Sequence, residues 1–183
     1  MFELPPSIEA LLPTEKLLGD EDAARLAIRL AEEGSRRGLG GPFGAIILDR
    51  EARTLVAAGV NLVIARRQPI AHAEIVAIAN AHAGDHPDVA CGSTPTSRDH
   101  LELVTSCEPC AMCYGAMHWA GLSRLVCCAR TEDAEQAGFD EGAKPADWAD
   151  HLRQRGIEVV RDVLRAEAIE VLSAYAARGG LIY

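Results

Sequence analysis

The residues with the clearest chemical potential in this sequence are two cysteines three positions apart. Cys110 and Cys113 follow Pro109 in the segment LELVTSCEPCAMCYGAMHWA at residues 101–120. Proline suits the first turn of a helix, because its missing N–H would have no partner there. Two cysteines at this spacing lie on one helical face, and the positive end of the helix dipole favours the thiolate. The pattern therefore predicts half of a metal site where a strand meets a helix.

A histidine and a glutamate earlier in the chain are candidates for the other half. His72 and Glu74 stand two positions apart at the start of an alanine-rich segment. Two thiolates and one imidazole give zinc three protein ligands and leave a fourth position open, which is typical of catalytic rather than structural sites. Zinc can lower the pKa of a bound water to about 7, so hydroxide is available at neutral pH. Glu74 would then lie beside the open position as general acid and base.

Each part of this pattern has a simpler explanation when it stands alone. Cys110-x-x-Cys113 could be a redox pair or two buried thiols, and a single His-x-Glu carries almost no information. The combination of H-x-E with P-C-x-x-C is more specific, because it is the signature of zinc-dependent deaminases. The alternative is a non-catalytic module stabilised by zinc or acting in redox chemistry. It would contain zinc or a disulfide but would not deaminate a substrate and release ammonia.

The elements that must position these residues alternate between strands and helices. After an irregular arm or short helix at residues 1–19, apolar spacing predicts helices at residues 23–37, 71–83, 110–120, 132–137, 148–154 and 163–177. Short apolar runs predict strands at residues 44–49, 54–60, 101–106, 124–129 and 156–160, the first two forming a hairpin. The remaining long stretches are predicted loops, at residues 61–70, 84–100 and 138–150. This order predicts an α/β protein in which helices cover both faces of a mixed sheet.

Composition and charge narrow the class of protein. We expect the 183 residues to form one compact domain. The chain has 18 Lys and Arg against 27 Asp and Glu, a net charge of −9 that disfavours a general nucleic-acid binder. Its start lacks the basic and apolar regions of a signal peptide, and no run of about twenty apolar residues predicts a membrane span. We therefore expect a cytoplasmic protein whose cysteines are metal ligands, catalytic groups or buried thiols. The six cysteines are Cys91, Cys107, Cys110, Cys113, Cys127 and Cys128, of which the last two read as buried thiols on a strand.

The sequence resembles the cytidine-deaminase-like zinc hydrolases and, within them, the bacterial guanine deaminases. The resemblance extends over nearly the whole chain and rests on GPFG at residues 41–44, AAGVN at 57–61, AHAEI at 71–75, TSCEPCAMC at 105–113 and GFDEG at 138–142. The zinc motif specifies only the superfamily, whereas GFDEG indicates the purine branch. The resemblance implies a three-layer α/β/α fold around a five-stranded mixed sheet, one Zn²⁺ per subunit and a homodimer.

The same resemblance implies roles for individual residues. His72 and the two motif cysteines would hold zinc, and Glu74 would move the proton. Asn61 would bind the substrate through its side-chain amide, with one end donating a hydrogen bond and the other accepting one. Glu141 would contact the guanine edge and assist proton transfer. The simpler explanations are a turn residue for Asn61 and a solvated loop carboxylate for Glu141.

Four further residues have weaker assignments. Phe43 and Trp119 are candidates for lining the base pocket, and both are as readily explained as core residues. Cys107 stands where a small or apolar residue would be expected. His118 is best explained as a hydrogen-bonded helix histidine. Related enzymes can carry a C-terminal tail that closes over the site, and the sequence leaves open whether a lid forms here.

The sequence as a whole predicts hydrolytic deamination of a purine base, in which guanine and water give xanthine and ammonia. Two rivals are enzymes of the same chemistry: a guanosine deaminase, which needs room for ribose, and a cytosine or triazine (ammeline) deaminase, which has a smaller pocket. A transfer RNA adenosine deaminase belongs to a different class, and the acidic balance and the GFDEG segment disfavour it.

Overall fold

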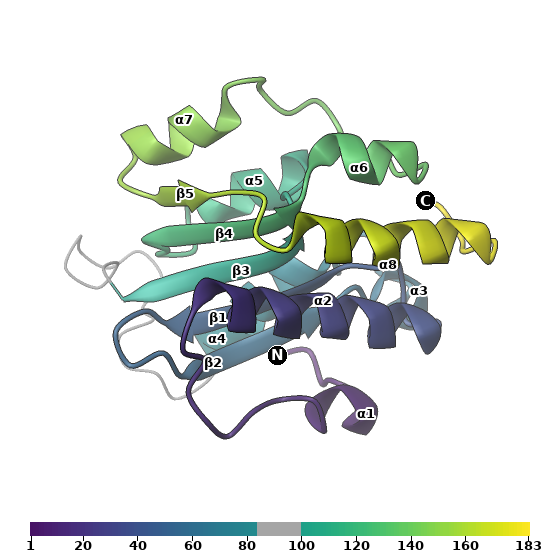
Figure 1. Ribbon diagram of the computed structural model, residues 1–183, viewed down its shortest axis with the longest axis horizontal. Coiled ribbons are helices and arrows are strands. Elements are labelled where there is room, and N and C mark those ends of the chain that lie inside the picture. The colour runs from purple at the N-terminus through teal and green to yellow at the C-terminus, as the bar shows by residue number, and fades with distance from the viewer. Residues whose placement is uncertain (84–99) are drawn as a thin grey trace.

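In the computed structural model of the protein, a five-stranded mixed sheet stands between two layers of helices (Figure 1). The structure describes residues 1–83 and 100–183. The strand order is β2-β1-β3-β4-β5, with β1 Gly44–Asp49, β2 Leu55–Val60, β3 Leu101–Cys107, β4 Arg124–Ala129 and β5 Glu158–Val160. β1 pairs antiparallel with both β2 and β3, whereas β3, β4 and β5 run parallel. The predicted fold class is confirmed.

Helices cover both faces of this sheet. The helices of the described chain are α1 Pro6–Glu9, α2 Asp20–Arg36, α3 Val63–Arg66, α4 Ala73–Ala83, α5 Ala111–Met117, α6 Thr131–Gln136, α7 Trp148–Gln154 and α8 Arg165–Ala177. α2 and α8 lie on the near face in Figure 1, and α4 and α5 lie on the far face. α3 is a single turn inside a segment predicted as a loop, because four residues are too few to show a helical period.

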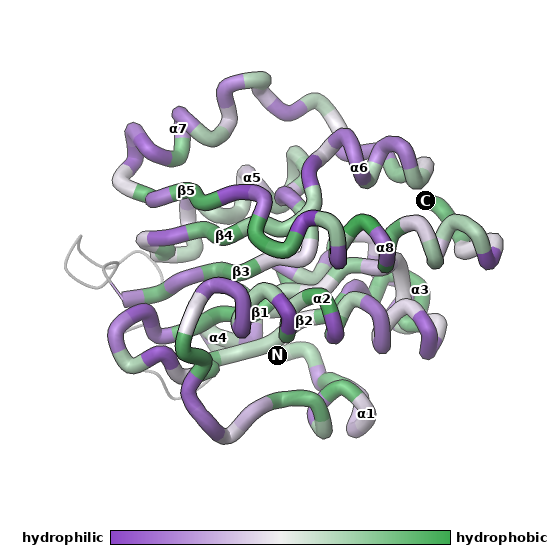
Figure 2. The backbone as a smooth tube through the Cα atoms, viewed as in Figure 1, coloured by the Kyte–Doolittle hydropathy of each residue, from purple (hydrophilic) through white to green (hydrophobic). Residues whose placement is uncertain are grey.

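The alternation of side chains along the strands divides the core into two halves, since successive residues of a strand face opposite sides of the sheet. Ile46 of β1 packs in the half covered by α2 and α8, and its neighbour Ile47 packs in the half covered by α4. Cys127 and Cys128 of β4 divide in the same way, and both are buried free thiols as predicted. Figure 2 shows hydrophobic and hydrophilic residues alternating along α2, which buries one face on the sheet.

A buried carboxylate holds the end of the sheet where β3 begins. Glu102 is fully buried and accepts hydrogen bonds from Nη1 of Arg53 at 3.0 Å and from Nη1 of Arg124 at 2.6 Å. Arg124 also binds both carboxylate oxygens of Asp20 at the start of α2, at 2.8 and 2.7 Å. These ion pairs join the β1–β2 turn, β3, β4 and α2 at one end of the sheet, away from the metal-binding motif that follows β3.

Two expectations concern residues that the structure does not describe. The predicted surface connection at residues 84–100 lies outside the described residues except for residue 100, and Cys91 lies outside them as well. Within the described part of the chain, no helix combines the length and the apolar character needed to cross a bilayer.

Candidate metal centre and active site

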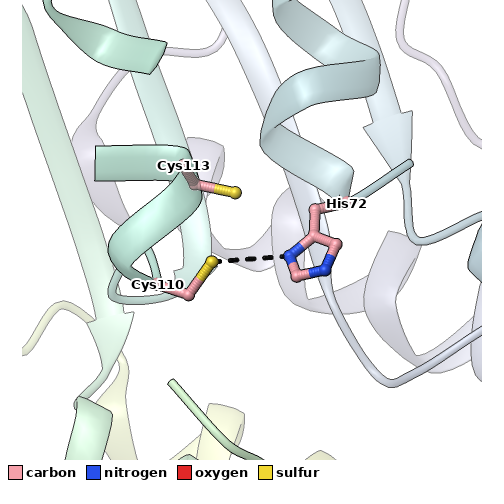
Figure 3. Close-up of side chains that lie close together, drawn as sticks. All are labelled: His72, Cys110 and Cys113. Atoms are coloured by element: carbon pink, nitrogen blue, oxygen red, sulfur yellow. Dashed lines mark hydrogen bonds between the residues drawn. The ribbon is translucent and has the colours of Figure 1, made fainter. Parts of the chain in front are cut away.

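Two helix N-termini bring the predicted metal ligands together. His72 directly precedes α4, Cys110 is the N-cap residue of α5, and Cys113 lies in the first turn of α5. Pro109 therefore stands one residue before the N-cap rather than in the first turn as predicted. The donor atoms of the three ligands lie within 4.8 Å of one another. Figure 3 shows the imidazole and both sulfur atoms turned toward one another, with Cys110 Sγ 3.6 Å from His72 Nδ1.

The spacing of these donors fits zinc. Bonds of about 2.3 Å to sulfur and about 2.1 Å to nitrogen, at the tetrahedral angle, place two such donors about 3.6 Å apart. The Cys110–His72 distance has this value. Among the described residues, the cluster contains three protein ligands and no fourth, as in a catalytic site with one open position.

The two thiols of the cluster are electrostatically unequal. A hydrogen bond from Cys113 lowers the pKa of Cys110 to about 4, and a hydrogen bond with His72 acts in the same direction. The hydrogen bond with Cys110 and burial both raise the pKa of Cys113. Cys110 is thus a ready-made thiolate ligand, and metal binding would release the proton of Cys113.

Two buried carboxyl groups face the same cavity as the metal ligands His72 and Cys110. Glu74 lies in the first turn of α4, and burial, followed by the Cys110 thiolate, raises its pKa to about 7. Glu141 is 6% exposed, so it is not a solvated loop carboxylate. Burial, followed by the negative charges of Cys110 and Glu74, raises the pKa of Glu141 to about 8. Groups with pKa values near neutrality can take up and return protons at the same pH.

The cavity itself is aromatic and acidic. Its lining comprises Phe43, Asn61, His72, Glu74, Glu108, Cys110, Phe139, Asp140, Glu141 and Tyr183. The rings of Phe43 and Phe139 meet edge to face with centroids 4.8 Å apart. Four of these described lining residues are acids, and none of them is Lys or Arg. The structure therefore brings Phe43, Asn61, Glu74 and Glu141 together with the metal ligands, as the sequence analysis expected.

Asn61 is oriented by contacts on its amide oxygen. Its Oδ1 accepts hydrogen bonds from the Val63 backbone N–H at 3.1 Å and from the Tyr183 hydroxyl at 2.5 Å. A backbone N–H can only donate, so the oxygen must face Val63, and Nδ2 is left to donate to a ligand. The predicted role of Asn61 in binding the substrate stays a prediction, and in this structure the donating end of its amide is the one left for a ligand. Gly40 is required beside this amide, because a Cβ there would stand 2.1 Å from Oδ1 of Asn61.

Trp119 does not belong to this cavity. It is 78% exposed and is not part of the lining. It lies beyond α5, which ends at Met117, whereas Cys110 caps the opposite end of that helix. His118 also departs from expectation: its buried Nδ1 has no hydrogen-bond partner among the described residues, and its ring packs on Tyr114 with centroids 4.8 Å apart. Cys107 is buried and donates its thiol to the Arg130 carbonyl at 3.5 Å.

Four lining residues were not singled out from the sequence, namely Glu108, Phe139, Asp140 and Tyr183. Glu108 lies inside the TSCEPCAMC segment, and Phe139 and Asp140 lie inside GFDEG, so their proximity to recognised motif residues was the available signal. Tyr183 reaches Asn61 across 122 positions of sequence, and no local pattern marks it.

Comparisons with known proteins agree with this geometry. The family model described as the cytidine and deoxycytidylate deaminase zinc-binding region matches residues 19–129. The guanine deaminase of Bacillus subtilis is 39% identical over 125 residues, which are 68% of this chain and 73% of that protein. A tRNA-specific adenosine deaminase of Haemophilus influenzae is 31% identical over 156 residues, 85% of this chain and 82% of that protein. A solved structure of guanine deaminase from Nitrosomonas europaea superposes with a TM-score of 0.84 at 38% identity, covering 96% of this chain and 94% of that one.

Proposed function

Because this chain belongs to the deaminase family defined by the cytidine and deoxycytidylate deaminase zinc-binding region, we propose that it hydrolyses guanine to xanthine and ammonia. The chain is a zinc-dependent deaminase by family and by its ligand set. One observation carries the choice of a base as substrate. Asn61, Glu74 and Glu141 face a single aromatic cavity together with the metal ligands His72 and Cys110.

The reaction forms a C–O bond and breaks a C–N bond at the amino-bearing ring carbon. Water supplies the oxygen, and its two protons end on the adjacent ring nitrogen and on the departing amine. Zinc, when bound, supplies the Lewis acidity that makes water a nucleophile at neutral pH. Glu74, whose pKa is about 7, accepts a proton from water and passes it to the ring nitrogen. Glu141, whose pKa is about 8, is protonated near neutrality and can donate to the substrate edge or to the leaving amine.

The lining of the cavity supports a neutral planar base. Phe43 and Phe139 offer apolar ring contacts to a flat heterocycle. Nδ2 of Asn61 donates to a carbonyl or ring-nitrogen acceptor, which guanine provides. Tyr183 packs against Asn61 at the cavity and leaves less room for a ribose. Among the described residues, the lining contains no Lys or Arg side chain that would pair with a phosphate.

A transfer RNA adenosine deaminase is the second candidate, favoured by the Haemophilus influenzae relative. Its substrate is a polyanion, and recognition of a polyanion depends on cationic side chains that neutralise phosphates. The cavity lining contains four acids in their place. The acidic cavity therefore favours guanine over transfer RNA.

The test is ammonia release by zinc-loaded protein from guanine, guanosine, adenine, cytosine, ammeline and an adenosine-containing transfer RNA. We expect guanine to be turned over fastest. A preference for guanosine would support the same reaction in a pocket that has room for ribose. Activity only on a pyrimidine, a triazine or transfer RNA would contradict the guanine proposal. The matched control is Glu74→Gln, which should retain zinc and lose at least about 100-fold in kcat, the scale of general acid–base catalysis. Near-normal turnover by this variant would refute the role of Glu74.

We also propose that the protein is a homodimer. Two neighbouring residues just after α5 support this proposal. The side chain of Trp119 is 78% exposed, and the buried Nδ1 of His118 has no hydrogen-bond partner among the described residues. A second copy packed there would cover the indole and offer the imidazole a partner. Light scattering of the purified protein measures the mass, and a monomer at micromolar concentration would contradict the proposal.

Two further proposals concern domain organisation and location. We propose that residues 1–183 act as one deaminase domain with residues 1–19 as an N-terminal arm. The arm supports this, because Ile8 is fully buried in the core and the Phe2 N–H donates to Oδ1 of Asn80 at 2.7 Å. Limited proteolysis should leave the arm attached.

We propose the cytoplasm as the location, because the five described cysteines are all free thiols, as a reducing compartment allows. Cell fractionation tests this.

A further inference from the structure

A buried lysine stands beside the metal centre without a part in the chemistry above. Lys144 follows Glu141 by three positions, in the loop at residues 137–147, and its side chain is 5% exposed. Lysine is rarely buried to this degree unless its charge is paired. Building on the proposed function, we propose that Lys144 is a positioning residue. It fixes the Glu141 loop (residues 137–147) to the metal-binding turn, residues 109–111, which carries the zinc ligand Cys110.

The first support is a direct contact with the backbone of the metal-binding turn. Lys144 Nζ donates a hydrogen bond to the carbonyl oxygen of Pro109 at 2.7 Å. This carbonyl belongs to the peptide that joins Pro109 to Cys110. The ammonium group therefore holds the chain at the residue immediately before a zinc ligand. Partners of this kind, outside the ligand set itself, orient the ligands and tune metal affinity.

A second hydrogen bond joins the same two segments. The backbone N–H of Ala111, the first residue of α5, donates to the carbonyl oxygen of Glu141 at 2.9 Å. The Glu141 loop is thus attached to the metal-binding turn on both sides of Cys110, by Lys144 before it and by Glu141 after it. Loss of Lys144 leaves one of these two hydrogen bonds and lets the loop pivot about it.

The charge of Lys144 is compensated by a paired network. Nζ lies 3.9 Å from Oε2 of the buried Glu108 and donates to Thr131 Oγ1 at 2.7 Å. Thr131 Oγ1 in turn donates to Oε2 of Glu108 at 2.9 Å, and Arg161 Nε donates to Oε1 of Glu108 at 2.6 Å. The ring of Trp148 covers the ammonium, 4.6 Å from Nζ to its centroid. Because every member has a partner, the network is rigid and can fix a geometry.

Rigidity at this point matters for catalysis rather than only for folding. Glu141 must stay at a set distance from the metal ligands to deliver a proton, and a misplacement of about 1 Å can cost about 100-fold in rate. Arg161 binds the same carboxylate of Glu108 and lies 5.6 Å from the Trp148 ring, yet among the described residues no hydrogen bond joins it to residues 109–111 or to the Glu141 loop. Arg161 therefore provides a matched control.

The experiment compares Lys144→Met, Lys144→Arg and Arg161→Met in the full chain. Zinc affinity is measured by chelator competition, the Glu141 loop by amide hydrogen exchange, and kcat and KM by ammonia release from guanine. We expect Lys144→Met to weaken zinc binding and to lower kcat, each about 10–100-fold, to speed exchange at residues 137–147 and to change KM far less. Lys144→Arg should recover most of the loss, because it keeps a charged donor. Arg161→Met should lower thermal stability and leave zinc affinity, loop exchange and kcat close to wild type.

The outcomes separate this inference from the proposed function. Wild-type zinc affinity and loop exchange in Lys144→Met would overturn the positioning role, and so would equal losses in Arg161→Met. Both measurements need no substrate, so they decide the question even if the wild-type protein releases no ammonia from guanine, a result that would overturn the proposed function alone. If Lys144→Met does not fold, Lys144→Gln, which keeps a neutral donor, takes its place under the same criteria.

Discussion

The close contact between β2 and α4 allows a test of how the fold places the active site. Gly59 of β2 lies against the first turns of α4. A Cβ at this position would stand 2.2 Å from the carbonyl oxygen of Ala73 and 2.6 Å from the backbone nitrogen of Ala77, whereas ordinary contact begins at 3.4 Å. Both atoms belong to helix backbone and cannot rotate away. Gly59→Ala therefore requires β2 and α4 to separate by roughly 1 Å.

Whichever element yields, a residue of the site moves. β2 is an edge strand that leads into Asn61, and α4 follows His72 and carries Glu74. Overpacking of this kind costs about 1–3 kcal/mol of stability, and a shift of about 1 Å between reacting groups can cost about 100-fold in rate. We expect zinc-loaded Gly59→Ala to stay folded and to lose about 100-fold in kcat/KM for guanine.

The matched control is Gly44→Ala on β1. A Cβ there would stand 2.3 Å from the Ala27 carbonyl oxygen and 2.6 Å from the Ala31 nitrogen. Both belong to α2, which lies on the other face of the sheet and carries no residue of the cavity, so outward movement of α2 displaces no lining residue. If β1 yields instead, the lining residue nearest to Gly44 in the chain is Phe43, which offers no polar group to the reaction. Urea unfolding and ammonia release are measured on the same zinc-loaded samples. Wild-type kcat/KM in Gly59→Ala, or an equal loss of kcat/KM in Gly44→Ala, would refute the reasoning.

Other contacts make separate predictions. Glu102→Gln removes the buried charge between two arginines, so the free energy of unfolding should fall by about 3 kcal/mol in urea while activity per folded molecule is kept; an unchanged urea midpoint would contradict this. Hydrogen bonds from Arg165 lower the pKa of Asp133, so its folded pKa lies below the unfolded value of about 3.9. The stability that Asp133 contributes is complete above the unfolded pKa and is lost as pH falls through the folded pKa, so unfolding free energies measured during acidification should fall less steeply in Asp133→Asn than in wild type. Tyr183→Phe removes the hydroxyl that binds Asn61 Oδ1 at 2.5 Å and should raise KM for guanine more than it lowers kcat; an unchanged KM would mean that Tyr183 does not orient the amide.

The secondary structure was largely predictable because most elements are long enough to show a period. β1 and β4 have the predicted bounds, and the other strands and longer helices differ from prediction by at most three residues at an end. α3 was missed because its four residues show no period, and the exact start of α5 depends on the extended backbone of Cys110 at the N-cap.

The chemistry of the metal centre was determined by the sequence itself. Residue types and short spacings decide which side chains one helix turn can bring together. The pattern of His72, Glu74, Cys110 and Cys113 therefore predicted a zinc-deaminase site before any contact was known. Their convergence needs only two helix N-termini at the same end of one sheet, which the order of strands and helices already favours.

Tertiary structure decided which distant groups complete the site. It buries Glu141, binds the oxygen of Asn61 to Tyr183, places Trp119 on the surface and seats Lys144 beside the metal-binding turn. These contacts join segments far apart in the chain, where sequence periodicity carries no information about distance. Burial in turn sets the pKa values of the carboxyl groups, because desolvation acts only once the surrounding chain has packed. The sequence alone determined which chemistry the metal ligands perform, and the packing decided which side chains meet the substrate.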